Sequence, residues 1–242
     1  MSLQCFSRKL IPLSSGVLLE ADLSVPPTNQ DEEGNRLAVC LHPWSWLGGS
    51  KDDPTLHILA ACFEDCGYHV LRFNSRGVGK STGRASFTGF SEAQDLRDIV
   101  KWGIDTVPDI RHVVILGYSH GSLIASLHPS LPPPVQIHHI LLSYPLGPRS
   151  WLTAFRSSTY ASALSDLIAD PSSDILVIYG DRDEFTGIAS YQTWAEELKR
   201  QAAGAGKGKL QVQRIDGGSH FWFHQAEIQS SLQQVVRAWL PR

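Results

Sequence analysis

Short runs of consecutive apolar residues alternate along the chain with longer stretches in which apolar residues recur every three or four positions. A continuous apolar run is typical of a parallel β-strand buried on both faces, and the longer spacing is typical of an amphipathic helix. Residues 17–26 instead alternate between apolar and polar, which predicts a half-exposed strand paired with the preceding segment as a hairpin. The other predicted strands are 36–42, 69–74, 112–118, 137–145, 174–180 and 210–217.

Helical spacing occurs between these strands and after the last of them. This strand–helix alternation predicts an α/β fold, with right-handed crossovers that place helices on both faces of a mostly parallel sheet. No linker or internal repeat divides the chain, so we expect a single domain over residues 1–242. The predicted helices are 54–66, 91–102, 120–127, 191–201 and 225–239, with one or two more within 151–170.

The composition is that of a folded globular protein, with 42% hydrophobic and 19% charged residues. The net charge of −3 gives no electrostatic reason to expect a nucleic acid or an anionic membrane as a partner. Charged residues interrupt every early apolar run, and no uncharged segment of about 18 residues is present to span a bilayer. We therefore expect no signal peptide and no membrane span, and predict a cytoplasmic protein.

The residues Gly117-Tyr118-Ser119-His120-Gly121 form the pattern G-x-S-x-G between a predicted buried strand and a predicted helix. In that context the pattern predicts a tight strand-to-helix turn that exposes the hydroxyl of Ser119 above the sheet. Side chains at the two flanking glycine positions would collide with the neighbouring helix and strand. We therefore interpret Ser119 as a candidate nucleophile and not as an incidental serine in a glycine-rich turn.

A serine hydroxyl is a weak nucleophile unless a general base accepts its proton, and the base needs an acid to orient it. His220 follows the last predicted strand in a glycine-rich loop and is the candidate base. Asp181 and Asp183 follow the preceding strand. We choose Asp183 as the orienting acid, because it lies further along a loop that can reach over the sheet. Asp181 is then a brace of the turn, and Glu184 is a weaker third candidate for the acid.

Acyl transfer also requires two N–H donors for the oxyanion of the tetrahedral intermediate. One is expected from the backbone of His120, directly after the nucleophile. The other is expected from the loop after the strand at 36–42. Pro43 has no N–H in that loop, so Trp44 is the first available donor past His42.

Aromatic residues on the same predicted loops are candidates to contact an acyl chain or an aromatic alcohol. They are Trp44, Trp46, Phe221 and Trp222, with Trp151 as a further member of this aromatic rim. Packing beneath the loops is an equally good interpretation of these side chains.

The stretch RFNSRGVGKST, residues 72–82, resembles a phosphate-binding loop, because Gly79-Lys80-Ser81 matches the end of that motif. The first glycine of the motif would fall at Asn74. The residues that follow continue into a loop broken by Gly83 and Gly89 instead of forming a helix. We therefore reject the hypothesis of a nucleotide-binding protein.

Together these stretches resemble the α/β-hydrolase superfamily over nearly the whole chain. The matching motifs, in the family's order, are LHPWSWLGGS, RFNSRGVGKSTG, GYSHG, YGDRDEF and GGSHFW. The chain is most similar to small serine hydrolases whose oxyanion loop begins His-Pro and ends Gly-Gly. The resemblance implies a mostly parallel sheet of about eight strands, and a Ser119–His220–Asp183 triad that forms an acyl-enzyme without a cofactor or metal ion. It also implies that residues 76–81 form a turn beside the active-site loops that binds no nucleotide.

Many members of the superfamily insert a helical lid after the sixth strand. Residues 146–173 are enough only for a short helical connection in this chain, so we expect no large cap domain and an open site. The expected function is that of a serine hydrolase that cleaves carboxylic ester or thioester bonds of a small or medium substrate. A peptidase or amidase of the same fold and a catalytically silent binding protein are the alternatives.

Overall fold

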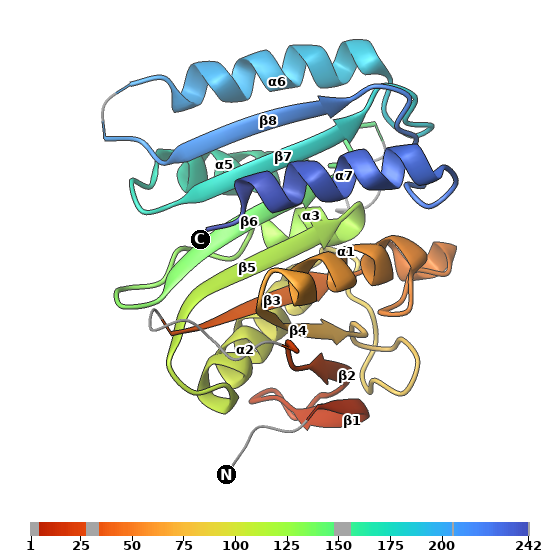
Figure 1. Ribbon diagram of the computed structural model, residues 1–242, viewed down its shortest axis with the longest axis vertical. Coiled ribbons are helices and arrows are strands. Elements are labelled where there is room, and N and C mark those ends of the chain that lie inside the picture. Colours follow the sequence, from red (N-terminus) through yellow and green to blue (C-terminus); the bar gives the residue numbers. More distant parts are fainter. Residues whose placement is uncertain (1–4, 28–33, 148–155, 205, 242) are drawn as a thin grey trace.

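One central β-sheet runs through the molecule (Figure 1). The computed structural model describes residues 5–27, 34–147, 156–204 and 206–241, and within them eight strands form the sheet in the order β1-β2-β4-β3-β5-β6-β7-β8. β2 is antiparallel to both of its neighbours, and the other pairs are parallel. The predicted mostly parallel sheet and its N-terminal hairpin are therefore confirmed. The strands are β1 (Phe6–Pro12), β2 (Leu18–Ser24), β3 (Asn35–Leu41), β4 (Tyr68–Phe73), β5 (Ile110–Tyr118), β6 (Gln136–Leu142), β7 (Asp174–Gly180) and β8 (Lys209–Ile215).

Helices cover both faces of the sheet, because its central strands are apolar on both faces (Figure 1). In β3, Leu37 and Val39 belong to the core beneath α2, α3 and α5, whereas Ala38 and Cys40 belong to the core beneath α1 and α7. The helices are α1 (Pro54–Asp65), α2 (Phe90–Thr106), α3 (His120–Ala125), α5 (Ser157–Ala169), α6 (Ile188–Ala202) and α7 (Ala226–Trp239), with a short 3₁₀ helix at Ser45–Leu47.

The parallel strands bring their carboxyl ends to one edge of the sheet. Leu41 at the end of β3 pairs with Gly117 in β5, and Gly180 at the end of β7 pairs with Ile215 at the end of β8. The loops that follow these strands therefore start from the same edge, which is where α/β folds place their ligands.

The connection between β6 and β7 is short. Its described part contains α5, which packs on the sheet through Tyr160 and Leu164. The Tyr160 hydroxyl also donates a hydrogen bond to the carbonyl of Thr88, just before α2. No large cap domain covers the sheet edge in the part of the chain that the structure describes. Trp151, predicted to belong to the aromatic rim, lies outside the described residues.

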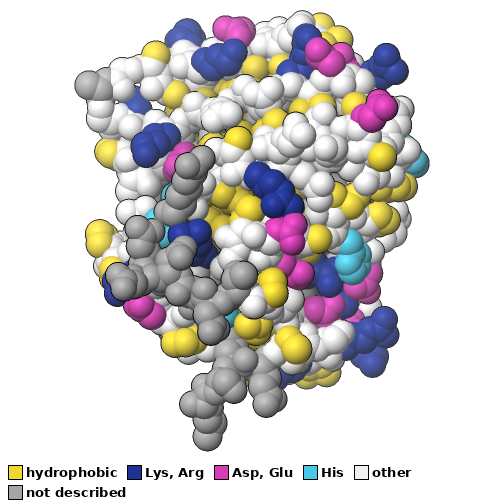
Figure 2. Space-filling view, viewed as in Figure 1, with side chains coloured by type: hydrophobic (Ala, Val, Ile, Leu, Met, Phe, Trp, Pro, Cys, Tyr) yellow, Lys and Arg dark blue, Asp and Glu magenta, His cyan; other side chains and the backbone are white. Residues whose placement is uncertain are grey.

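Basic and acidic side chains are interspersed on the face that Figure 2 shows, with no gathering of basic side chains in one patch there. This distribution agrees with the small net charge of −3. Within the described ranges, the helices are too short or too polar to cross a bilayer.

Candidate active site

Ser119 lies on a tight turn between β5 and α3. Its φ of 54° and ψ of −120° are unfavourable for a residue with a side chain, so the turn stores backbone strain. A Cβ atom added at Gly117 would lie 2.4 Å from the carbonyl oxygen of Gly121. A Cβ atom added at Gly121 would lie 2.7 Å from the carbonyl oxygen of Leu41. The turn therefore requires both glycines, as the G-x-S-x-G pattern predicts.

Three side chains from separate loops form one hydrogen-bonded chain. Nε2 of His220 lies 2.9 Å from Oγ of Ser119, and Nδ1 of His220 lies 2.7 Å from Oδ2 of Asp183. An ionised carboxylate can only accept hydrogen bonds, so Nδ1 carries the imidazole proton and Nε2 is left to accept the proton of Ser119. The three residues are almost excluded from solvent. The structure thus brings together the three residues that the sequence analysis selected.

The carboxylate of Asp183 is held by four donors. Its Oδ1 accepts the backbone N–H groups of Phe185 and Thr186 at 2.8 and 2.9 Å. Its Oδ2 accepts the hydroxyl of Tyr191 at 3.2 Å in addition to the imidazole of His220. These bonds fix the carboxylate on the side of His220 that faces away from Ser119.

The other two acidic candidates serve the loops. Oδ1 of Asp181 accepts the N–H of Gly217 at 2.7 Å and so braces the turn after β8, as expected for the structural member of the pair. Oε2 of Glu184 accepts the backbone N–H of His220 at 2.8 Å. The side chain of Glu184 therefore contacts the backbone of His220. The position of Glu184 in the sequence does not predict this role.

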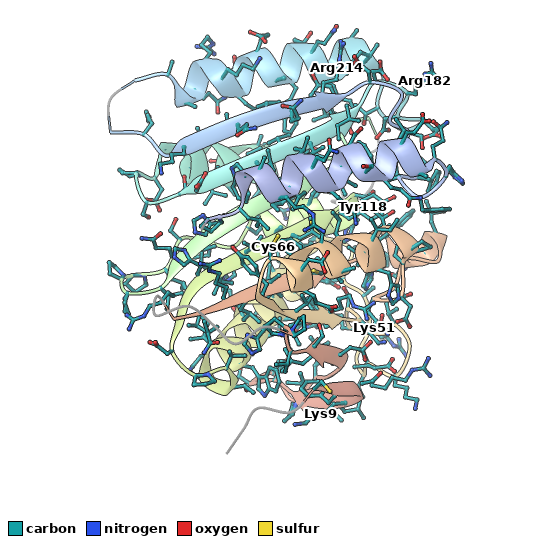
Figure 3. The ribbon with its side chains drawn as sticks, in the orientation of Figure 1. Lys9, Lys51, Cys66, Tyr118, Arg182 and Arg214 are labelled. Atoms are coloured by element: carbon teal, nitrogen blue, oxygen red, sulfur yellow. The ribbon has the colours of Figure 1, made fainter. Side chains whose placement is uncertain are left out.

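The side chain of Tyr118 also contacts the backbone of His220, at its carbonyl group. It lies at the end of β5 (Figure 3), and its hydroxyl donates to the carbonyl of His220 at 2.7 Å. Burial, followed by the charge of Asp53, raises the pKa of Tyr118 above its ordinary value, so the hydroxyl keeps the proton that it donates. The sequence predicts no role for this side chain, because its partner lies far away along the chain.

Trp222 does not belong to the aromatic rim. It is 1% exposed, and its indole N–H donates to Oγ of Ser143 at 2.9 Å. Its ring packs so closely on Gly218 that a Cβ atom there would lie 2.8 Å from the ring. The expectation that Trp222 contacts substrate is therefore wrong: this residue anchors the loop that carries His220.

Phe221 does lie at the surface, beside a residue that the sequence analysis missed. Phe221 and Phe185 are each 38% exposed, and their ring centroids lie 5.6 and 4.6 Å from that of His220 in edge-to-face contacts. Trp46 is 67% exposed and stacks on Trp44 with centroids 5.6 Å apart. The only signal for Phe185 in the sequence is its position two residues after Asp183.

The loop after β3 folds back on itself. The N–H groups of Leu47 and Gly49 both donate to the carbonyl of Trp44, each at 3.1 Å. A Cβ atom added at Gly49 would lie 2.2 Å from the carbonyl oxygen of Pro43, so the loop needs this glycine to close. The backbone N–H groups of Trp44 and His120 donate to no acceptor among the described residues.

His42 links this loop to the turn after β4. Its Nε2 accepts the N–H of Ser75 at 3.0 Å, so its Nδ1 carries the proton and donates to the carbonyl of Pro43 at 2.6 Å. Burial lowers the pKa of His42 to about 4, and burial together with His42 lowers the pKa of His120 to about 4. Both imidazoles are therefore uncharged at neutral pH.

Backbone N–H groups of the turn at residues 75–82 already donate hydrogen bonds to acceptors within the protein. The N–H of Lys80 donates to Oε2 of the buried Glu20 at 2.9 Å, and the N–H of Gly77 donates to the carbonyl of Thr82 at 3.1 Å. The amide of Asn74 bonds to the same carboxylate oxygen at 2.9 Å. No helix starts at Lys80, since α2 begins at Phe90. A carboxylate thus lies where a nucleotide-binding loop would receive a phosphate, which supports the rejection of that hypothesis.

Within the described residues, no group of three or more histidine, cysteine, aspartate or glutamate side chains has the arrangement of a metal site. The four cysteines carry no disulfide; Cys40 and Cys62 are buried. Burial raises the pKa of each of these two thiols to about 12, which keeps both in the unreactive protonated form.

A model of the alpha/beta hydrolase family matches residues 38–165, slightly more than half of the chain. The chain belongs to the alpha/beta hydrolase family. This alpha/beta hydrolase is 25% identical over 191 residues to an uncharacterized protein of Rickettsia prowazekii, a match that covers 79% of this chain and 74% of the relative. It is also 25% identical over 173 residues to an uncharacterized protein of Schizosaccharomyces pombe, covering 70% and 72% of the two chains.

Solved structures share the fold of this alpha/beta hydrolase over its whole length. A serine hydrolase without a lid from Xanthomonas campestris has a TM-score of 0.74 and 25% identity, covering 100% of this chain and 98% of its own. A serine hydrolase homologue from Coxiella burnetii has a TM-score of 0.73 and 22% identity, covering 100% and 99%. An esterase from Pyrococcus furiosus has a TM-score of 0.69 and 20% identity, covering 99% and 92%.

Proposed function

We propose that this alpha/beta hydrolase cleaves carboxylic ester or thioester bonds of small or medium substrates through an acyl-enzyme on Ser119. The observation that carries the proposal is the hydrogen-bonded chain from Ser119 through His220 to Asp183, at the end of a strained strand-to-helix turn. The fold shared with a lidless serine hydrolase and with an esterase supports the same class of reaction.

Acylation begins when Oγ of Ser119 attacks the carbonyl carbon and its proton passes to Nε2 of His220. The tetrahedral intermediate then collapses and the bond to the alcohol or thiol breaks. Nε2 of His220 returns the proton to the departing oxygen or sulfur. Asp183 accepts a hydrogen bond from Nδ1 throughout, which holds the imidazole in the tautomer that can take the proton and stabilises the imidazolium.

Deacylation repeats these steps with water as the nucleophile. His220 takes a proton from the water, the hydroxide adds to the acyl carbon, and collapse of the second intermediate returns the proton to Oγ of Ser119. The products are a carboxylic acid and the free enzyme, so the cycle uses only groups of this chain and one water molecule.

The backbone N–H groups of Trp44 and His120 are the proposed donors to the oxyanion. Neither has another acceptor among the residues that the structure describes, so both can donate to an oxygen that becomes negative. The carbonyl oxygens of Leu41 and His42 lie against Gly121, which keeps the loop after β3 next to the turn of Ser119.

Turnover of p-nitrophenyl butyrate by the wild type and by Ser119→Ala tests the function. We expect the substitution to lower kcat by about 10⁴-fold or more. Ser126→Ala is the matched control: it is the same substitution at the other end of α3, where the Ser126 hydroxyl donates to the carbonyl of Leu123. Absence of wild-type turnover would instead favour a binding protein of this fold.

A further inference from the structure

We propose that Phe185 and Phe221 form the surface that binds the alcohol part of the substrate, so that the preferred substrates are esters of apolar and above all aromatic alcohols. The proposal rests on the proposed esterase function and specifies which half of the substrate these two rings contact. The loop position of Phe221 in the sequence already made it a candidate to contact the substrate. The place of Phe185 beside His220 is known only from the structure.

The path of the proton determines where the alcohol lies. The bond between the acyl carbon and the alcohol oxygen breaks during acylation, and that oxygen receives its proton from Nε2 of His220. The oxygen must therefore come within about 2.6–3.2 Å of Nε2. The first atoms of the alcohol beyond this oxygen then lie beside the His220 ring, whatever the acyl group is.

The surroundings of that ring are aromatic. Its ring contacts are with Tyr118, Phe185 and Phe221, at centroid distances of 5.8, 4.6 and 5.6 Å. Tyr118 is 1% exposed and has no surface left for a substrate, whereas Phe185 and Phe221 are each 38% exposed. Besides Asp183 and Ser119, which bond to the two ring nitrogens, the polar side chains of Glu184 and Tyr118 bond to the backbone of His220. The two exposed side chains in ring contact with the imidazole are therefore both apolar.

The arrangement of the two rings favours a further ring. Phe185 and Phe221 meet edge to face, with centroids 6.0 Å apart and planes at 70°. An aromatic alcohol can extend this arrangement with another edge-to-face or offset contact. A sugar or a charged alcohol would instead lose water without gaining a hydrogen-bond partner from these side chains.

Benzyl butyrate and methyl butyrate separate the alcohol from the rest of the substrate. The two esters give the same acyl-enzyme, so the ratio of their kcat/KM values reports the alcohol in the transition state of acylation. We expect the wild type to prefer the benzyl ester and the ratio to fall about tenfold in both Phe185→Ala and Phe221→Ala. Phe185→Leu retains an apolar side chain and should keep part of the preference.

Phe87→Ala is the matched control. Phe87 is 77% exposed, lies in the loop before α2 and is absent from the ring contacts of His220 among the described residues. Its substitution should leave the benzyl-to-methyl ratio unchanged.

The rate at which a fluorophosphonate labels Ser119 separates binding of the alcohol from positioning of His220. Fluoride leaves in that reaction in place of an alcohol, so the Phe185 and Phe221 variants should label at the wild-type rate. The proposal is overturned if the wild type shows no benzyl preference, or if both esters and the labelling rate fall together in the variants. If the wild type is labelled but both variants keep the wild-type ratio of benzyl to methyl ester, the proposal is also overturned. The esterase function is retained in that case. A wild type that neither labels nor hydrolyses either ester removes the function and the proposal with it.

Discussion

The backbone of His220 is held as firmly as its ring. Glu184 accepts its N–H and Tyr118 donates to its carbonyl, at 2.8 and 2.7 Å, while Asp183 and Ser119 bond to the two ring nitrogens. A base that must reach one proton at hydrogen-bond distance gains from such fixing, because small displacements reduce the rate of proton transfer steeply. Glu184 and Tyr118 are therefore positioning residues in this account.

Removal of either backbone contact should lower activity without abolishing it. We expect Glu184→Ala and Tyr118→Phe to lower kcat by about 10-fold to 100-fold with little change in KM. Glu184→Gln keeps an oxygen acceptor for the N–H of His220 and should retain most of the activity. Steady-state kinetics on a p-nitrophenyl ester provide the measurement, and equal kcat values for the alanine and glutamine variants would contradict the role of Glu184.

The two aspartates after β7 should differ sharply in their effect on activity. Asp183→Asn removes the charge that stabilises the imidazolium and disturbs the tautomer of His220, so kcat should fall by about 10⁴-fold. Asp181→Asn keeps an oxygen that can accept the N–H of Gly217, and its activity should stay close to that of the wild type. A larger loss for Asp181→Asn than for Asp183→Asn would contradict the assignment of Asp183 as the orienting acid.

At the scale of elements, the site is built from the ends of strands. The turn of Ser119 follows β5, the loop of Asp183 follows β7 and the loop of His220 follows β8, and the parallel pairing of the strands brings these loops together. The two glycines around Ser119 allow α3 to approach β3 and β5 closely. The site therefore depends on backbone contacts as much as on side chains.

Gly121→Ala should destabilise the protein, because its Cβ atom would lie 2.7 Å from the carbonyl oxygen of Leu41, which cannot move without its strand. We expect the free energy of unfolding to fall by about 1–3 kcal/mol. Gly187→Ala is the control: Gly187 has φ of −62° and nothing near its Cβ position, so alanine should be neutral or stabilise by about 0.4–1 kcal/mol. Urea unfolding measures both, and equal effects would contradict the close approach.

The sequence predicts the local parts of this site and misses the distant ones. The G-x-S-x-G turn and its glycines are evident because the strain and the contacts arise within a few residues. The choice of Asp183 agrees with the geometry, because the loop length after β7 already limits which carboxylate reaches His220. The sequence leaves substrate contact and packing equally open for Trp222, because its partner Ser143 is distant in the sequence and only the sheet brings them together.

At the scale of the whole molecule, the sheet encloses several uncharged histidines. Burial lowers the pKa of His42 to about 4 and that of His139 to about 3. His139 is fully buried in β6, where its Nε2 lies 3.0 Å from the carbonyl oxygen of His128. The order of strands and the layers of helices follow from the hydrophobic pattern, but the histidine environments depend on packing that the pattern does not contain.

The protein should lose stability as the pH falls from about 6.5 to about 4. The folded pKa values of His42 and His139 lie below the unfolded value near 6.5, so the unfolded state binds more protons in this window and is stabilised relative to the folded state. Each histidine contributes a slope of up to about 1.4 kcal/mol per pH unit. Urea unfolding at pH 7 and pH 5 measures the change, and His139→Leu should make the slope shallower. A free energy of unfolding that is equal at the two pH values would contradict this description.

The central claim is that Ser119 is a nucleophile activated by His220. The most direct measurement is mass spectrometry of the protein after reaction with a fluorophosphonate, followed by digestion to locate the adduct. We predict a single adduct on Ser119 that is absent from Ser119→Ala and forms much more slowly in His220→Ala. An adduct on another residue, or no adduct on the folded wild type, would contradict the account.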